Sequence, residues 1–393
     1  MSGLIQYIQS LEDRSFEAVR EHFTSRGCRV TDGGEYYMIC VPNNLEDQTT
    51  EFGQAATQAV GSILRKDNHA LVCYGFPKTK EVKIDDQLSA ELINASEYID
   101  GTLLRAYHNG LKWCLSTSGT IDAYGSYWIS SKSFGELFDE CLGRIYGKRT
   151  TFSESELASG LDVDCTYQFI LSHPSVHLDQ NRKPYLYHVG TFSTKGFSYV
   201  EHTVHQSIHT PNKKTFHSYA ELVESLSSNQ EIRGYIFYLN GIRYKVFQPS
   251  YLYTRSLLGN TSNLYLRYIE AKAEGKDVEL LNYFPNLRYY SSWVDRCMGV
   301  ISKGVLECYV NKFILKDKKA PIDYYYRPIV YELHGAFIKS QQKVNYQTVY
   351  SLIWSYHPKR INFLLNGLKM IKTGDVVIEY NASKEAENNE PLV

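Results

Sequence analysis

Two Asn-Gly pairs, each lying between short runs of β-forming residues, constrain the fold of this chain more than any other feature. Asn109-Gly110 separates TLLRAYH from LKWCL, and Asn240-Gly241 separates GYIFYL from IRYKVF. Asn and Gly readily adopt the positive φ angles that a tight turn between antiparallel strands requires. Helical stretches such as 132–142 occur between strand-like runs but do not alternate with them regularly. The pattern predicts an α+β domain built on antiparallel sheets.

Beyond about residue 255 the hydrophobic residues recur every three or four positions. The clearest runs are Val294, Cys297, Met298, Ile301 and Val305, and then Val349, Leu352, Ile353 and Tyr356. This spacing predicts helices. We therefore expect an α+β domain over 1–255 and a mostly helical domain over 256–393, with the polar tail 382–393 disordered.

Composition excludes several classes of protein. The net charge is −1, so no long-range field draws the chain to nucleic acid or to a membrane surface, and a polyanion site must be local. No run of 18 apolar residues is present, so no membrane span is expected. The eight cysteines are scattered without a C-x-x-C pair, which favours reduced thiols in a cytoplasmic protein. The 33 tyrosines are explained more simply by packing in β-rich cores than by base stacking.

Four segments follow the order and approximate spacing of motifs in the nucleotidyltransferase domain of phage-type RNA ligases. They are GFPKTKEV (75–82), YIDGT (98–102), the segment 165–192, and the segment 233–252. They correspond to the family's F-P-K segment, its K-x-D-G motif, its F-E-L-x-x-P-x-N-R segment with the following strand, and its E-G and K-h-K strands. The chain thus resembles the ATP-dependent RNA ligases, and its remainder resembles RNA-ligase-like proteins of large DNA viruses. The resemblance implies an antiparallel-sheet, ATP-grasp-like nucleotidyltransferase domain.

The chain departs from the family at the positions that carry the chemistry. In the family, the lysine of K-x-D-G attacks the α-phosphate of ATP, but here Tyr98 takes that position. Ile170 and Arg233 replace the two family glutamates, and Phe247 replaces the second lysine of K-h-K, whereas Lys245 retains the first. An unperturbed phenol has a pKa of about 10, so it is a nucleophile only when a base or cation activates it.

Strand alternation gives these residues an expected geometry. Residues two apart on a strand share a face, so Tyr98 and Asp100 are predicted to point together into a pocket. By the same rule, residues 243, 245 and 247 face one side of their strand, and residues 242, 244 and 246 face the other. The predicted nucleotide- or RNA-binding set, which includes no metal ligand, is Lys78, Tyr98, Asp100, Gly101, Arg233, Arg243, Lys245 and Phe247.

Three functions are compatible with this pattern. The leading hypothesis is a degenerate, non-enzymatic RNA-ligase-like protein that retains nucleotide or RNA binding, with Arg233 and Lys245 holding a phosphate without metal. The second is a structural or assembly protein, for instance a viral one, that uses the ligase fold as a scaffold for other proteins. The third is an active RNA ligase with an atypical nucleophile, which would require ATP and Mg²⁺.

Other motifs favour simpler explanations. Lys83-Ile84-Asp85-Asp86 mimics the nucleophile motif but lacks its glycine. The segment 143–150 resembles a phosphate loop, yet it has three residues between glycines and follows an apparent helix. The histidine group lacks the spacing and cysteine partners of a zinc site. Its members are His173, His177, His202, His205, His209 and His217.

A basic segment in the helical region is more ambiguous. Lys312, Lys316, Lys318 and Lys319 precede the aromatic run Tyr324-Tyr325-Tyr326-Arg327. Interleaved cations and aromatic rings suit single-stranded RNA, through phosphate pairing and base stacking. A solvated loop beside core tyrosines explains the same residues, and is the favoured interpretation.

Overall fold

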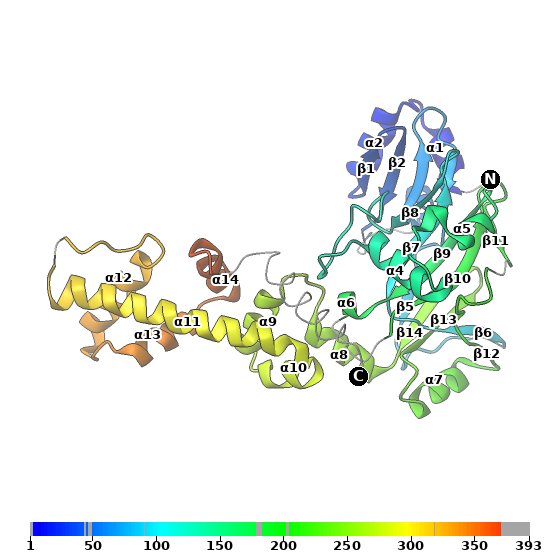
Figure 1. Cartoon of the computed structure of the whole chain (residues 1–393). Helices are drawn as coiled ribbons and strands as arrows, with labels where there is room; N and C mark the ends of the chain where they lie inside the picture. The colour runs from blue at the N-terminus through cyan, green and yellow to red at the C-terminus, as the bar shows by residue number, and fades with distance from the viewer. Residues whose placement is uncertain are drawn as a thin grey trace. The chain divides into compact units, whose positions relative to one another are not determined.

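The computed structural model divides the chain into two compact units, Met1–Leu252 and Tyr253–Val393. It describes residues 3–42, 45, 49–89, 91–177, 183–201, 204–317 and 319–370 (Figure 1). The tail 382–393, His202 and Lys318 lie outside the described residues. Three β-sheets build the first unit, and the described part of the second unit is helical. The predicted α+β class, with antiparallel sheets followed by a helical region, is therefore confirmed.

The first sheet has the strand order β1-β2-β3-β4, and each neighbouring pair is antiparallel. Its helices share a hydrophobic core with the strands, and α2 begins after Ser15, whose hydroxyl accepts a hydrogen bond from the Ala18 amide at 3.3 Å. The strands are β1 (Arg29–Gly33), β2 (Tyr36–Cys40), β3 (Ser62–Arg65) and β4 (Leu71–Cys73). The helices are α1 (Gly3–Ser10), α2 (Phe16–Thr24) and α3 (Glu51–Gln58).

The second sheet has the order β11-β10-β9-β7-β8 and is antiparallel throughout. Helix α4 covers one face, where Leu137 and Phe138 join Leu104 and Phe169 in one core (Figure 1). The strands are β7 (Thr102–His108), β8 (Trp113–Thr117), β9 (Cys165–Ser172), β10 (Tyr185–Ser193) and β11 (Tyr199–Val200). The helical segments are α4 (Phe134–Tyr146), η1 (Phe152–Glu154), α5 (Glu156–Ser159) and α6 (Pro174–His177).

The third sheet has the order β12-β6-β13-β14-β5, in which only the β14–β5 pair is parallel among the described strand pairs. Helix α7 covers one face, where Leu222 packs with Phe237 and Val246. The strands are β5 (Lys80–Val82), β6 (Ile93–Glu97), β12 (Lys213–Phe216), β13 (Gly234–Leu239) and β14 (Ile242–Phe247). The helix is α7 (Tyr219–Ser228).

Both predicted hairpins are confirmed. β7 and β8 pair across the Asn109-Gly110 turn, and β13 and β14 pair across Asn240-Gly241, where both turn residues have positive φ. The prediction that Tyr98 and Asp100 lie on a strand is wrong. β6 ends at Glu97, and residues 98–101 instead form the connection that leads from the third sheet to the second.

Gly101 ends this connection where the chain meets β9. A Cβ at Gly101 would lie 2.4 Å from Ile170 Cγ2 and 2.6 Å from the Leu171 carbonyl oxygen. These distances are shorter than any ordinary van der Waals contact, and the Leu171 oxygen is a backbone atom of the paired strand β9. Only glycine therefore allows the chain to enter β7 this close to β9.

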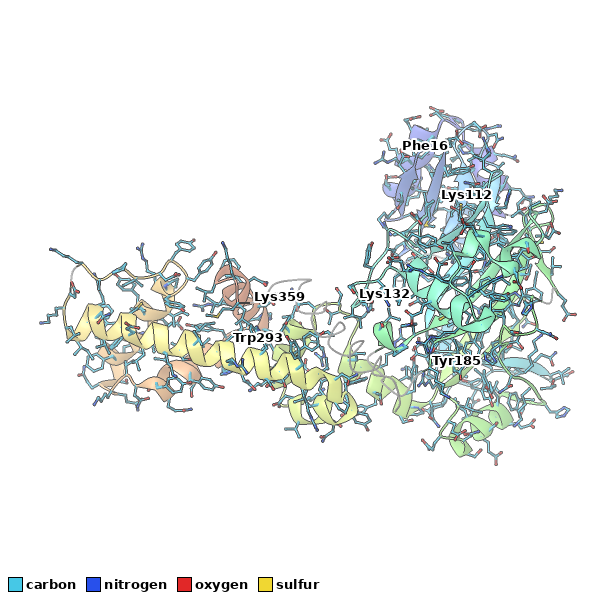
Figure 2. All side chains as sticks on the ribbon, in the orientation of Figure 1. Phe16, Lys112, Lys132, Tyr185, Trp293 and Lys359 are labelled. Carbon is cyan, nitrogen blue, oxygen red and sulfur yellow. The ribbon has the colours of Figure 1, made fainter. Side chains whose placement is uncertain are left out.

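The second unit contains the long helix α11, along which the predicted hydrophobic stripe is confirmed. Val294, Met298, Ile301 and Val305 are fully buried. Trp293 on the same helix donates its indole N–H to the Met370 carbonyl at 2.8 Å (Figure 2). Helix α8 (Pro249–Leu258) includes the last residues of the first unit and the first residues of the second. The described elements that follow it are α9 (Leu264–Ala273), α10 (Asp277–Tyr283), η2 (Pro285–Leu287), α11 (Arg288–Tyr309), the π-helical η3 (Val310–Ile314), α12 (Arg327–Ser340), α13 (Tyr346–Trp354) and α14 (Pro358–Gly367).

We expect Gly101→Ala to lower the free energy of unfolding of the N-terminal unit by about 1–3 kcal/mol, because the added methyl group overpacks the junction with β9. Gly160→Ala is the matched control, since its Cβ would lie 3.6 Å from the Leu157 carbonyl oxygen, an ordinary contact. Urea denaturation followed by circular dichroism measures both. Equal stability of the two variants would contradict the assigned role of Gly101.

Candidate functional site

An open cleft of about 1390 Å³ lies between the second and third sheets. Much of its lining comes from the faces that α4 and α7 leave uncovered, since Leu103 alternates with Leu104 of the α4 core and Ile236 alternates with Tyr235 of the α7 core. Ala95 and Phe237 belong both to the lining and to the α7 core. The second sheet contributes Leu103, Ile170, Gly190 and Tyr199. The third sheet contributes Asn94, Ser96, Lys213, Ile236, Tyr238, Arg243 and Lys245.

Tyr98 lines this cleft at the start of the connection between the sheets. Its amide donates to the Gly234 carbonyl at 2.8 Å, which attaches the connection to β13. Its ring meets the Phe247 ring edge-on at 4.7 Å between centroids, and the Tyr251 ring lies 5.9 Å away. The Tyr98 ring therefore belongs to an aromatic cluster with Phe247 and Tyr251.

Asp100 belongs to a different environment from Tyr98, since it is not among the residues that line the cleft. One carboxylate oxygen accepts a hydrogen bond from Arg233 at 3.1 Å, and the other accepts one from the Tyr251 hydroxyl at 3.1 Å. The Arg233 guanidinium also lies 5.8 Å from the centre of the Tyr251 ring. Arg233 is thus engaged with the connection between the sheets, at the sequence position where the ligase family has a glutamate.

Arg243 extends from β14 into the cleft wall beside Phe76 and Thr79. Its guanidinium stacks on the Phe76 ring at 3.8 Å and donates to the Thr79 hydroxyl at 2.7 Å. Burial lowers the pKa of Arg243 to about 10, and the nearby Tyr238 hydroxyl opposes that shift. Within the described part of the chain, no carboxylate pairs with this cation.

Lys245, the next residue on the same face of β14, has a carboxylate partner. Its ammonium group lies 3.0 Å from Glu81 on the adjacent β5 and 5.0 Å from the centre of the Phe247 ring. The predicted alternation of β14 is confirmed, because Val246 is buried under α7 while Arg243 and Lys245 line the cleft.

Lys78 is not among the residues that line the cleft, although Pro77 and Thr79 on either side of it are. Its ammonium group donates to the Pro42 carbonyl at 3.3 Å, and partial burial lowers its pKa. The cleft therefore brings together Tyr98, Gly101, Arg243 and Lys245. Phe247 packs against the Tyr98 ring, and Asp100 pairs with Arg233.

Sequence reasoning missed Lys213, Tyr199 and Tyr238, which also line the cleft. Lys213 and Tyr199 lie on short strands without a motif. Lys213 joins the site only because β12 pairs with β6, and Tyr199 only because β11 pairs with β10. Tyr238 was detectable, since it lies directly opposite Arg243 in the predicted hairpin.

The other motifs have structural explanations. Lys83 and Asp86 form a turn, in which the Asp86 carboxylate accepts from the Lys83 amide at 2.9 Å. The segment 143–150 contains the C-terminal end of α4, where Gly147 has a φ of 68°, and a helix C-terminus disfavours anions. In the described residues, which exclude His202, no group of three or more His, Cys, Asp or Glu side chains could hold a metal. His173 pairs with Glu140 at 3.4 Å.

The residues of the basic segment in the second unit differ in exposure. Lys312 lies in η3, and Lys316 and Lys319 are exposed. Tyr324 is 76% exposed, whereas the Tyr325 ring packs 5.8 Å from Phe363. Of the three tyrosines, Tyr324 alone presents most of its ring to solvent.

No protein-family profile matches the chain. The immediate-early protein ICP-46 homologue of Invertebrate iridescent virus 6 is 33% identical over 81 residues, which cover 18% of this chain and 18% of that protein. The ICP-46 homologue of Invertebrate iridescent virus 3 is 34% identical over 73 residues, covering 19% of this chain and 15% of that protein. The chain thus spans less than a fifth of the length of these curated relatives.

Two solved structures share a distant likeness. One is provisionally assigned as an ATP-dependent DNA ligase from Aquifex aeolicus, with a TM-score of 0.37, 12% identity and 70% coverage of each chain. The other is an archaeal ATP-dependent RNA ligase, with a TM-score of 0.41, 10% identity, and coverage of 71% of this chain and 72% of that one. At these scores the likeness establishes no shared family, so the cleft is interpreted from its own residues.

Two global properties also bear on function. Among the described residues, no helix combines the length and the apolar character needed to cross a membrane. All eight cysteines lie within the described residues, and each is a free thiol.

We expect a double-mutant cycle between Asp100→Asn and Arg233→Gln to give a coupling energy of about 0.5–1 kcal/mol, because the pair is only partly exposed and Tyr251 orients the carboxylate. The Lys148–Glu156 pair is the control, since both side chains are about 60% exposed, and no measurable coupling is expected there. Urea denaturation measures both cycles. Equal coupling in the two pairs would show that Arg233 does not anchor the connection.

Proposed function

We propose that this chain is a catalytically degenerate relative of the ATP-dependent RNA ligases that binds nucleotide or RNA in the cleft without forming a covalent adenylate. One observation carries the proposal. The residue in the position of the family's nucleophile, Tyr98, lines the cleft, but its ring is packed against Phe247 and Tyr251.

The residues around Tyr98 support the loss of covalent chemistry. The Tyr98 ring packs against the Phe247 and Tyr251 rings, and a phenol acts as a nucleophile only when a base or a cation activates its hydroxyl group. Lys245 is the lysine that lies over Phe247, but its ammonium group is engaged in an ion pair with Glu81 at 3.0 Å. Lys245 is therefore not favoured as a substitute for the nucleophilic lysine of the ligase family.

The replaced glutamates support the loss of metal handling. Mg²⁺ prefers hard oxygen ligands. Ile170 presents an aliphatic side chain to the cleft, at the position where the RNA ligases that this chain resembles have one of the two glutamates. Arg233, in the position of the other, brings a positive charge that would repel a metal ion. These two positions therefore supply no carboxylate oxygen for a metal ion.

The cleft retains features that suit nucleotide or RNA. Lys213 on β12, and Arg243 and Lys245 on β14, give it cationic side chains from two strands, and Tyr199 and Tyr238 add aromatic rings. Cations that pair with phosphate, combined with rings that stack on bases, are the general basis of single-stranded nucleic-acid binding. The overall charge of −1 makes this a local property of the cleft.

Incubation with ATP labelled at the α-phosphate tests the covalent chemistry. We expect no labelled protein with or without Mg²⁺, because Tyr98 and Lys245 are both engaged in other contacts. Tyr98→Lys is also expected to remain unlabelled, since the two glutamate positions are still Ile170 and Arg233. An active ATP-dependent RNA ligase serves as the positive control. Covalent label on the wild-type chain would establish an active ligase and overturn the degenerate assignment.

Binding is tested on the wild-type chain by fluorescence anisotropy with a labelled single-stranded RNA and by calorimetry with ATP. We expect measurable binding of at least one of them in the presence of EDTA, because the cations of the cleft need no metal. Failure to bind both would remove nucleic acid and nucleotide from the function.

A scaffold role is the second candidate, and the helical unit provides the observation that favours it. Tyr331 and Ile338 on α12 are 50% and 59% exposed, and the Tyr331 ring packs against Phe313. Exposed apolar side chains along one helix can form a protein contact. Retention of a protein partner by the wild-type chain, and its loss in a Tyr331→Ser, Ile338→Ser double variant, would favour this role.

A further inference from the structure

Arg243 has an environment that the fold alone does not explain. Its side chain is half-buried, its Nε–H is buried without a hydrogen-bond partner, and its guanidinium donates to one neutral hydroxyl group, that of Thr79. By contrast, Lys245 pairs with Glu81, and Arg233 pairs with Asp100. Arg243 lines the cleft without a carboxylate partner among the described residues, and it differs from Lys213 and Lys214, which also lack one, in that their side chains are exposed.

A charge that is partly removed from water without a counter-ion is unfavourable, and so is a buried N–H group without a hydrogen-bond acceptor. Stacking on Phe76 at 3.8 Å compensates only in part, because a cation–π contact contributes roughly 0.5–2 kcal/mol. A guanidinium with unused donors, held rigidly by a ring on one side and a hydroxyl on the other, is suited to an incoming phosphate, which it can meet with two parallel hydrogen bonds.

Aromatic rings flank this cation in the same cleft. Tyr238 pairs directly with Arg243 across the β13–β14 hairpin, and Tyr199 lies on β11 at the edge of the second sheet. The two tyrosines are 46% and 50% exposed, although both line the cleft. Half-exposed rings beside a phosphate-binding cation provide the faces on which successive bases stack.

The size of the cleft indicates the length of the ligand. Pockets for single small molecules usually measure about 300–1,000 Å³, and this cleft measures about 1390 Å³ and is open. Two carboxylates, Glu97 and Glu201, also line it, against the four cations Lys213, Lys214, Arg243 and Lys245. The cationic excess favours a polyanion that runs along the cleft rather than one compact anion.

We propose that Arg243 is the phosphate anchor for a short single-stranded nucleic acid, whose bases stack on Tyr199 and Tyr238. The proposal rests on the proposed function and specifies its ligand and its contacts. It assigns the anchoring role to Arg243 in place of Arg233 and Lys245, each of which already has a carboxylate partner. No metal ion is needed, because the phosphate charge is balanced by side chains.

The test measures binding of a fluorescently labelled, eight-nucleotide single-stranded RNA by anisotropy over a range of salt concentrations, in EDTA. We expect Arg243→Gln to weaken binding about tenfold and to reduce the salt slope by about one, as loss of one phosphate contact would do. Tyr199→Ala, Tyr238→Ala should weaken binding about tenfold with an unchanged slope, since stacking is uncharged. Arg144→Gln, at an exposed position on α4, is the control and should bind like the wild type.

A second measurement uses the wild-type protein and does not depend on the folding of a variant. Phenylglyoxal modifies arginine side chains, and mass spectrometry locates the modified residues. Bound RNA should slow the modification of Arg243 and leave that of Arg144 unchanged. AMP at equal nucleotide concentration should protect Arg243 less well than the RNA, because it lacks the second stacked base.

Each outcome decides one point. Unchanged affinity and salt slope in Arg243→Gln, or no protection of Arg243 by RNA, would overturn the anchor while leaving the proposed function intact. Equal protection by AMP and RNA would overturn the strand-binding part and indicate a mononucleotide site. Absence of any binding by the wild-type chain would instead overturn the proposed function itself.

Discussion

The connection over residues 98–101 is the constraint on which the rest of the first unit depends. It carries the chain from β6 of the third sheet to β7 of the second, so its geometry sets how the two walls of the cleft face each other. Contacts along its whole length help to hold it. The Tyr98 amide bonds to Gly234, the Asp100 carboxylate pairs with Arg233 and Tyr251, and Gly101 lies against β9.

This arrangement separates two roles that a motif comparison would merge. The Asp-Gly pair has a structural explanation that involves no substrate, because Asp100 forms an ion pair and Gly101 solves a steric problem. The cleft itself contains a different set of residues, among which Arg243 is a partly buried cation without a carboxylate partner among the described residues. In our proposal, residues 98–101 serve to position the two sheets, and the contact with the bound anion is made instead by Arg243 on β14.

Local features of the fold were predictable because they depend on neighbouring residues. The hairpins follow from Asn-Gly turns, the stripe on α11 follows from helical spacing, and the faces of β14 follow from alternation. The end of β6 was predicted incorrectly. A strand ends where its partners end, and β12 and β13 pair with β6 only up to Ser96 and Glu97, which no local pattern in the sequence specifies.

The sequence alone fixes which side chains stand at each position, such as a phenol at position 98 and an aliphatic side chain at position 170. Which cations are neutralised follows only from the folded structure. Arg233, Arg243 and Lys245 are equivalent as positive charges in the sequence, yet two of them meet carboxylates from distant segments and one does not. The physical reason is that ion pairing depends on distances across strands, which are set by sheet pairing and not by spacing along the chain.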